Sequence, residues 1–171
     1  MRSICAAILV CLMTAAAASD PLARSDEKFL NDFAQANAAQ VVAGKFAAEN
    51  AQDSDVKAFG RVIADDYSKA LSRIAEFARA REIEVKAKPG VADKGKELLL
   101  ERRGAAKFDE AYVSSQVDAA EEAIGRIQAV INEGQDASVK QLAARSLPEV
   151  RHHLEMAKRL QGRLAVLAVL Q

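Results

Sequence analysis

One pattern occurs twice along the chain and constrains its fold more than any other feature. Each copy carries apolar residues spaced three and four apart, which is the period of an amphipathic helix. The repeated positions are the aromatic pairs Phe29–Phe33 and Phe108–Tyr112 and the Val-Lys pairs Val56–Lys57 and Val139–Lys140. Two similar helical hairpins joined by a longer link predict an all-α four-helix bundle.

The apolar spacing also sets the expected helices. They span residues 26–51, 54–82, 107–133 and 136–170, and the connection inside each pair is short. A short connection makes the two helices of a pair antiparallel neighbours. Ser54 is the expected N-cap of the second helix, because its hydroxyl can accept a backbone N–H bond.

Three residues mark special positions in these helices. Gly44 lies in mid-helix, where glycine costs about 1 kcal/mol relative to alanine, so we expect it where a side chain does not fit. Gly134 follows the third helix and should end it. Pro148 lacks a backbone donor and should kink the fourth helix. Residues 146–149 match a capping box, which would allow a complete break there.

The link at residues 84–106 is long enough to cross the whole bundle. Pro89 and Gly90 break a helix, and the leucines at 98–100 predict a short helix lying over the bundle. A helix of about 28 residues is about 42 Å long, and a partly extended link at about 3.3 Å per residue covers that distance. The pattern favours a ferritin-like bundle with a long crossover between the second and third helices.

The first residues have the order of a secretory signal peptide. Arg2 gives a positive start, an apolar stretch covers residues 4–13, and small residues lead to Ala18. An apolar stretch of about ten residues is too short to serve as a membrane anchor. We therefore expect residues 1–18 to be removed and residues 19–171 to form one domain that is periplasmic or secreted.

The positions of the cysteines and the balance of charge limit the expected disulfides and binding partners. Cys5 and Cys11 both lie in the expected signal peptide, so the exported chain would contain no disulfide. The chain carries 24 basic and 24 acidic residues, and this balance argues against nucleic acid, which is bound by basic surfaces. The charges are mixed along the chain, and no later apolar run is long enough for a transmembrane helix.

Three polar side chains fall on the expected inner faces of the helices: Gln40, Tyr67 and His153. A buried polar group must be hydrogen-bonded, because an unpaired one is costly. The three side chains should therefore line a small polar pocket or a degenerate metal site, or else bond to one another and fix the register of the helices. We favour the second interpretation, an inner polar seam with no catalytic role.

Metal chemistry has a limited set of candidates. Residues 149–152 match Glu-x-x-His, but a di-iron bundle needs two such motifs and two further glutamates, and the sequence has one match. Glu149 and His153 lie one turn apart, and Glu121 could reach His153 from the third helix. These three are the metal candidates. We expect Asp66 to be solvated, because adjacent helical aspartates point about 100° apart and form no acid pair.

Several short motifs resemble one known family. They are Gly44–Ala47, Val56–Phe59, Asp66–Ala70, Phe108–Val113, and Leu147–Pro148 followed by His153–Leu154. The chain resembles, over residues 26–164, the secreted bacterial family called domain of unknown function 4142. The resemblance implies a ferritin-like fold and a cell-envelope setting. Members often carry glutamate where this chain has Gln40 and histidine where it has Tyr67 or Ala120. Of that inner set, only His153 remains.

These observations favour an exported, non-catalytic binding or interaction module of the cell envelope. The sequence has no nucleophile motif and no glycine-rich phosphate loop, and it indicates no cofactor and no particular partner. One alternative is a metal-binding bundle (iron, zinc or manganese) or an oxidoreductase with a reduced ligand set. Another is a bundle that associates with itself or with an envelope protein through Leu164, Leu167 and Leu170 at its end.

Overall fold

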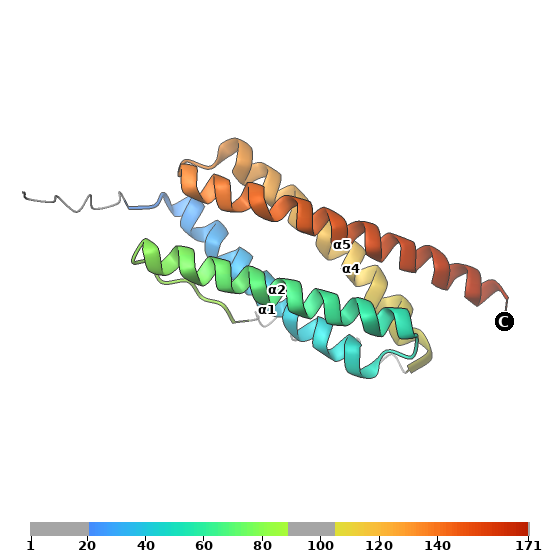
Figure 1. Cartoon of the computed structure of the whole chain (residues 1–171). Helices are drawn as coiled ribbons and strands as arrows, with labels where there is room; N and C mark the ends of the chain where they lie inside the picture. The colour runs from blue at the N-terminus through green and yellow to red at the C-terminus, as the bar shows by residue number, and fades with distance from the viewer. Residues whose placement is uncertain (1–20, 89–104, 171) are drawn as a thin grey trace, which may run out of the picture.

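Four long helices make up nearly all of the structure, a computed structural model that describes residues 21–88 and 105–170 (Figure 1). The helices are α1 (Arg24–Asn50), α2 (Ser54–Ala80), α4 (Ala105–Glu133) and α5 (Ala137–Val169). No strand occurs within the described ranges. The all-α four-helix bundle is confirmed, and the helix boundaries lie within two residues of the expected ones at each end.

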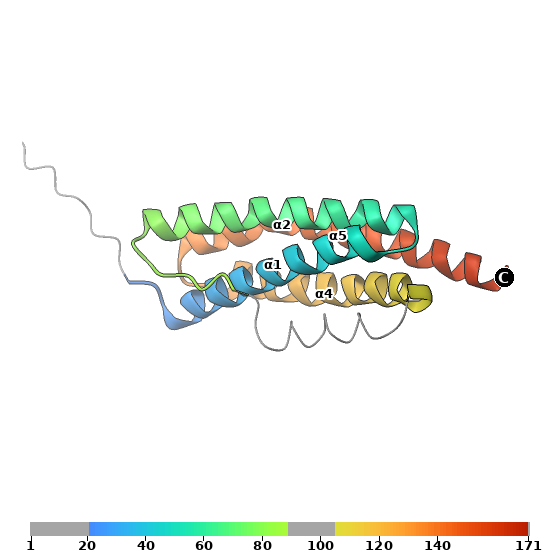
Figure 2. The same cartoon turned by 90° about the horizontal axis from the view of Figure 1, so that it is seen from below.

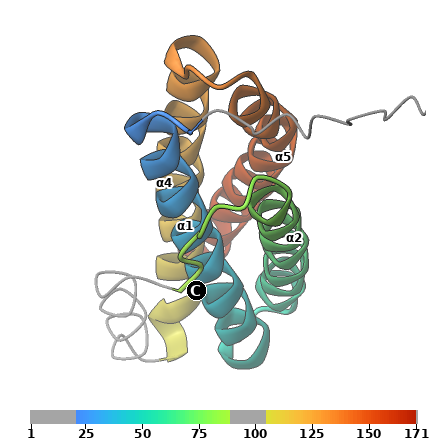
Figure 3. The same ribbon diagram turned by 90° about the vertical axis from the view of Figure 1, so that its left-hand side faces the viewer.

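The helices pack as two hairpins placed side by side. α1 lies along α2, α4 lies along α5, and narrower contacts join α2 to α5 and α1 to α4, so the helices form a ring when viewed along the bundle (Figure 3). Every neighbouring pair in this ring is antiparallel (Figures 1 and 2). The interior between them is filled by apolar side chains such as Leu30, Phe59, Tyr112 and Ile127.

A long crossover joins the two hairpins, as predicted. α2 and α4 run in the same direction, so the chain must return along the length of the bundle between them (Figure 1). The described start of this link runs beside α1, where the backbone N–H of Lys86 donates to Asn31 Oδ1 at 2.9 Å. The short helix expected at residues 98–100 lies outside the described residues.

Gly44 and Gly60 lie where α1 and α2 approach each other very closely. A Cβ on Gly44 would lie 2.7 Å from both Ala64 N and Gly60 O, and a Cβ on Gly60 would lie 2.7 Å from Gly44 O. Real Cβ atoms do not approach backbone atoms this closely, so the two helices meet only because both positions lack a side chain. The expectation that no side chain fits at Gly44 is confirmed.

Two details of the helix ends differ from expectation. The N-cap of α2 is Asp53 and not Ser54: its carboxylate accepts the backbone N–H groups of Asp55 and Val56. A hydroxyl and a carboxylate can both cap a helix, but the carboxylate also carries a negative charge that complements the positive end of the helix dipole. The possible break at residues 146–149 is also wrong, because α5 continues through Pro148. The Ser146 hydroxyl donates to Leu142 O within the helix instead of capping.

The end of α4 agrees with expectation, because the helix stops at Glu133, directly before Gly134.

Each hairpin turn is held by a carboxylate from the opposite hairpin. Asp109 on α4 accepts the backbone N–H groups of Gln52 and Asp53, with the shortest N···O distance at 2.6 Å. Asp26 on α1 accepts those of Gln135 and Asp136, the shortest at 2.7 Å. The repeat in the sequence therefore becomes an approximate two-fold arrangement in which each half fixes the loop of the other.

The helix-capping aspartates extend this reciprocal arrangement. Asp53 at the start of α2 pairs with Arg163 near the end of α5, and Asp136 at the start of α5 pairs with Arg81 at the end of α2. The guanidinium of Arg163 holds the pKa of the Asp53 carboxyl below its usual value, and Arg81 does the same to the pKa of Asp136. These pairs tie together the ends of the two hairpins.

None of the described helices combines the length and the apolar character needed to cross a membrane.

Candidate metal centre

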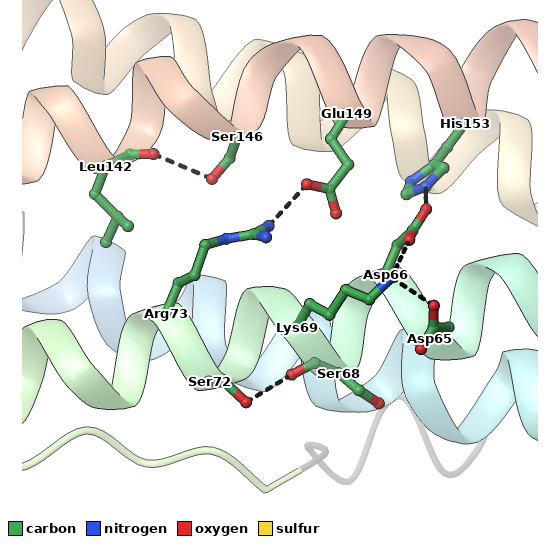
Figure 4. Close-up of polar contacts among 10 residues, drawn as sticks. All are labelled: Asp65, Asp66, Ser68, Lys69, Ser72, Arg73, Leu142, Ser146, Glu149 and His153. Atoms are coloured by element: carbon green, nitrogen blue, oxygen red, sulfur yellow. Dashed lines mark hydrogen bonds and ion pairs between the residues drawn. The ribbon is translucent and has the colours of Figure 1, made fainter.

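Three metal-ligating side chains converge where α2 faces α5, near the middle of the bundle (Figure 4). Asp66 comes from α2, and Glu149 and His153 come from α5. One ligand atom from each of the three residues lies within 4.8 Å of the other two. His153 is buried, with 3% of its surface exposed, whereas the two carboxylates are half-buried. We call this group the Asp66–Glu149–His153 cluster.

Helix register explains why these residues meet. Glu149 and His153 are four residues apart, so both lie on the α5 face that is turned toward α2. Asp66 stands in the same register after Val56 as Glu149 does after Val139. The approximate two-fold arrangement therefore brings these two carboxylates to the same place between the hairpins. Ala70 is the counterpart of His153 in the first hairpin, so only the second hairpin supplies an imidazole.

His153 is held by Asp66. Its Nε2 and Asp66 Oδ2 are 3.0 Å apart, so the ring donates a hydrogen bond to the carboxylate from Nε2. Its Nδ1 is buried and has no hydrogen-bond partner among the described residues.

Basic side chains of α2 flank both carboxylates (Figure 4). Arg73 Nη2 lies 2.7 Å from Glu149 Oε2, and Lys69 Nζ lies 3.5 Å from Asp66 Oδ1. Lys69 is also 2.6 Å from Asp65, which is exposed. Lys69 and Arg73 therefore form, with the two carboxylates of the cluster, a short row of alternating charges on the α2–α5 face, next to the buried imidazole of His153.

The inner polar seam is brought together only in part. The rings of Tyr67 and His153 pack with centroids 5.1 Å apart. Burial, followed by the charges of Glu149 and Asp66, raises the pKa of the Tyr67 hydroxyl above its usual value, so it stays protonated. Gln40 is half-buried, and its Oε1 has no hydrogen-bond partner in the described part of the chain. No hydrogen bond between any two of these three side chains is seen there.

The metal candidates from the sequence separate in the structure. Glu149 and His153 lie together, but Glu121 is exposed on α4 and forms an ion pair with Lys158 at 2.7 Å. Asp66, which we expected to be solvated, replaces it in the cluster. The signal that could have found Asp66 is the internal repeat, since aligning Val56 with Val139 also aligns Asp66 with Glu149.

Comparison with known proteins places the chain in a family. The sequence pattern of the domain of unknown function DUF4142 matches residues 11–160. The chain belongs to the DUF4142 family. No curated protein sequence matches this DUF4142 protein. Among solved structures, a DUF305 fragment from Deinococcus radiodurans is similar to it, with a TM-score of 0.74 and 10% sequence identity. The alignment covers 84% of this chain and 99% of the fragment, and it supports the bundle fold alone.

The donors of this DUF4142 protein suit one divalent transition-metal ion. Zinc binds imidazole nitrogen and carboxylate oxygen at about 2.0–2.2 Å, which sets tetrahedral ligand atoms about 3.4 Å apart. The cluster spans 3.0 Å between Nε2 and Oδ2 and at most 4.8 Å overall, so small side-chain rotations suffice. Three protein ligands leave a fourth position for water. One imidazole and two carboxylates are too few for a two-metal centre of the di-iron kind.

Proposed function

We propose that this DUF4142 protein is an exported, non-catalytic binding module that holds one divalent transition-metal ion, of the zinc class, between its two hairpins. The observation that carries the proposal is the convergence of a ring nitrogen of His153 with the carboxylates of Asp66 and Glu149. Export is supported by the signal-like order of residues 1–18. The proposal takes up the metal-binding alternative from the sequence and assigns it a different ligand set.

The surroundings of the cluster suit binding better than catalysis. The imidazole is buried and fixed against Tyr67, while each carboxylate keeps about a quarter of its side-chain surface exposed, at 26% for Asp66 and 28% for Glu149. An ion can therefore enter from the α2–α5 surface without an opening of the bundle. Because the ligands come from both hairpins, a bound ion would also add a tie between α2 and α5.

Zinc titration of the exported chain, residues 19–171, tests the proposal. We expect one equivalent to bind in calorimetry, with a rise in melting temperature because the ion binds the folded state selectively. His153→Ala should abolish both effects, since it removes the nitrogen ligand, and Glu149→Gln should weaken binding about tenfold or more. Glu121→Gln is the matched control and should bind as wild type does. Binding that survives His153→Ala would contradict the assignment.

A second candidate function is association through the end of α5. α5 extends past the other helices at its C-terminal end (Figure 2), and Val166, Leu167, Val169 and Leu170 are 61%, 40%, 86% and 77% exposed. Leu164, the first leucine expected there, is half-buried against the core. Nearby, a groove of about 370 Å³ between α2 and α5 is lined largely by apolar side chains, among them Val62, Met156 and Leu160.

Truncation after Arg163 tests this second candidate. The cut keeps the Arg163–Asp53 pair and removes the exposed apolar end. We expect the truncated chain to keep its helicity while any self-association, measured by sedimentation at increasing concentration, is lost. Global unfolding on truncation would instead show that this segment belongs to the core. Unchanged sedimentation would show that self-association does not use this end.

A further inference from the structure

We infer that Arg73 is a built-in competitor for the metal ion, and that it makes the Asp66–Glu149–His153 cluster an exchangeable site. This inference rests on the proposed function and adds how that site is regulated. The contact that carries it is the ion pair between Arg73 Nη2 and Glu149 Oε2 at 2.7 Å. An ion must either displace Arg73 from this oxygen or bind Oε1 of a carboxylate whose charge the guanidinium already compensates.

The three ligands differ in what they must give up. Asp66 and His153 are bonded to each other, so an ion that binds both replaces a contact inside the cluster. Glu149 is bonded to a cation from outside the cluster, so the ion must either displace that cation or share the carboxylate with it. The guanidinium can leave readily, because the Arg73 side chain is 44% exposed and solvent lies beside it.

The charged side chains around the cluster also weaken its affinity for a metal ion. Asp65, Asp66 and Glu149 carry three negative charges and Lys69 and Arg73 carry two positive ones, so a divalent ion changes the local net charge from −1 to +1. At a half-exposed surface the repulsion between the ion and these two cations is moderate and screened by salt. The result is a site that accepts an ion reversibly at high concentration and releases it when the concentration falls. A site built for permanent retention would have neutral or acidic neighbours.

The test compares zinc affinity in Arg73→Gln with that in Arg61→Gln, which removes an exposed arginine from the same helix outside the cluster. We expect Arg73→Gln to bind zinc about tenfold more tightly and to release it more slowly to a chelator, as removal of one half-exposed competing charge predicts. Arg61→Gln should match wild type. Arg73→Lys keeps the charge without the planar fork and should fall between the two. Circular dichroism verifies that each variant is folded.

The outcomes separate the two proposals. Equal zinc affinity in wild type and Arg73→Gln would overturn the competition while leaving the metal site intact. No binding in either protein would overturn the metal site, and the competition with it. Binding in Arg73→Gln alone would support competition and would contradict metal binding by the natural chain.

Discussion

Replacing Gly44 with alanine should lower the free energy of unfolding by about 3 kcal/mol, the upper part of the range for overpacked cores. The new Cβ would lie 2.7 Å from two backbone atoms of α2, Ala64 N and Gly60 O. Backbone atoms of a helix cannot rotate away as a flexible side chain can, so α1 and α2 must separate where the two glycines meet. Urea unfolding followed by far-UV circular dichroism measures the loss.

Gly125→Ala is the matched control for this prediction. Gly125 also lies inside a helix, but a Cβ added there meets nothing within 4 Å. Alanine should therefore stabilise the protein by up to about 1 kcal/mol through helix propensity alone. The two glycine substitutions are expected to have opposite signs. A neutral or stabilising Gly44→Ala would show that α1 and α2 are not held as closely as the structure has them.

Replacing Asp109 with alanine should cost about 3 kcal/mol, because it removes the acceptor for two backbone N–H groups bound by a charged group. Asp109 is 7% exposed and fixes the turn between α1 and α2 by bonding Gln52 and Asp53. Its loss also removes a tie between the two hairpins. Thermal and urea unfolding should both report the change, and hydrogen exchange should accelerate at the amides of Gln52 and Asp53.

Two comparisons give this second prediction its control. Asp118→Ala removes an exposed aspartate from the same helix and should change stability by no more than about 0.5 kcal/mol. Asp26→Ala removes the counterpart that binds Gln135 and Asp136, and it should cost about as much as Asp109→Ala if the two-fold arrangement is real. A loss confined to one of the pair would contradict the reciprocal role.

The elements of the fold could be predicted because their signals are local. Apolar spacing fixed the helices to within two residues at each end, and a glycine in mid-helix indicated the close contact at Gly44. The sequence does not distinguish Ser54 from Asp53 as the N-cap of α2, because both residue types cap helices and they are adjacent. The roles of Asp26 and Asp109 depend on contacts between hairpins, which no local pattern encodes.

The candidate site was predicted less completely for the same reason. Glu149 and His153 share one helix, so their spacing showed that they could act together. Asp66 acts across the gap between α2 and α5, and within its own helix it resembles any surface aspartate. Periodicity alone predicts Glu121 near His153, but in the structure Glu121 pairs with Lys158. The internal repeat was the one signal in the sequence that joined Asp66 to Glu149.

Anomalous diffraction at the zinc edge, from crystals of residues 19–171 grown with zinc, tests the central claim most directly. The account predicts one ion between α2 and α5, at about 2.0–2.2 Å from His153 Nε2 and from carboxylate oxygens of Asp66 and Glu149, with Arg73 not bonded to the Glu149 oxygen that binds the ion. Zinc bound only at other surface residues, with the Arg73–Glu149 and Asp66–His153 contacts unchanged, would contradict it.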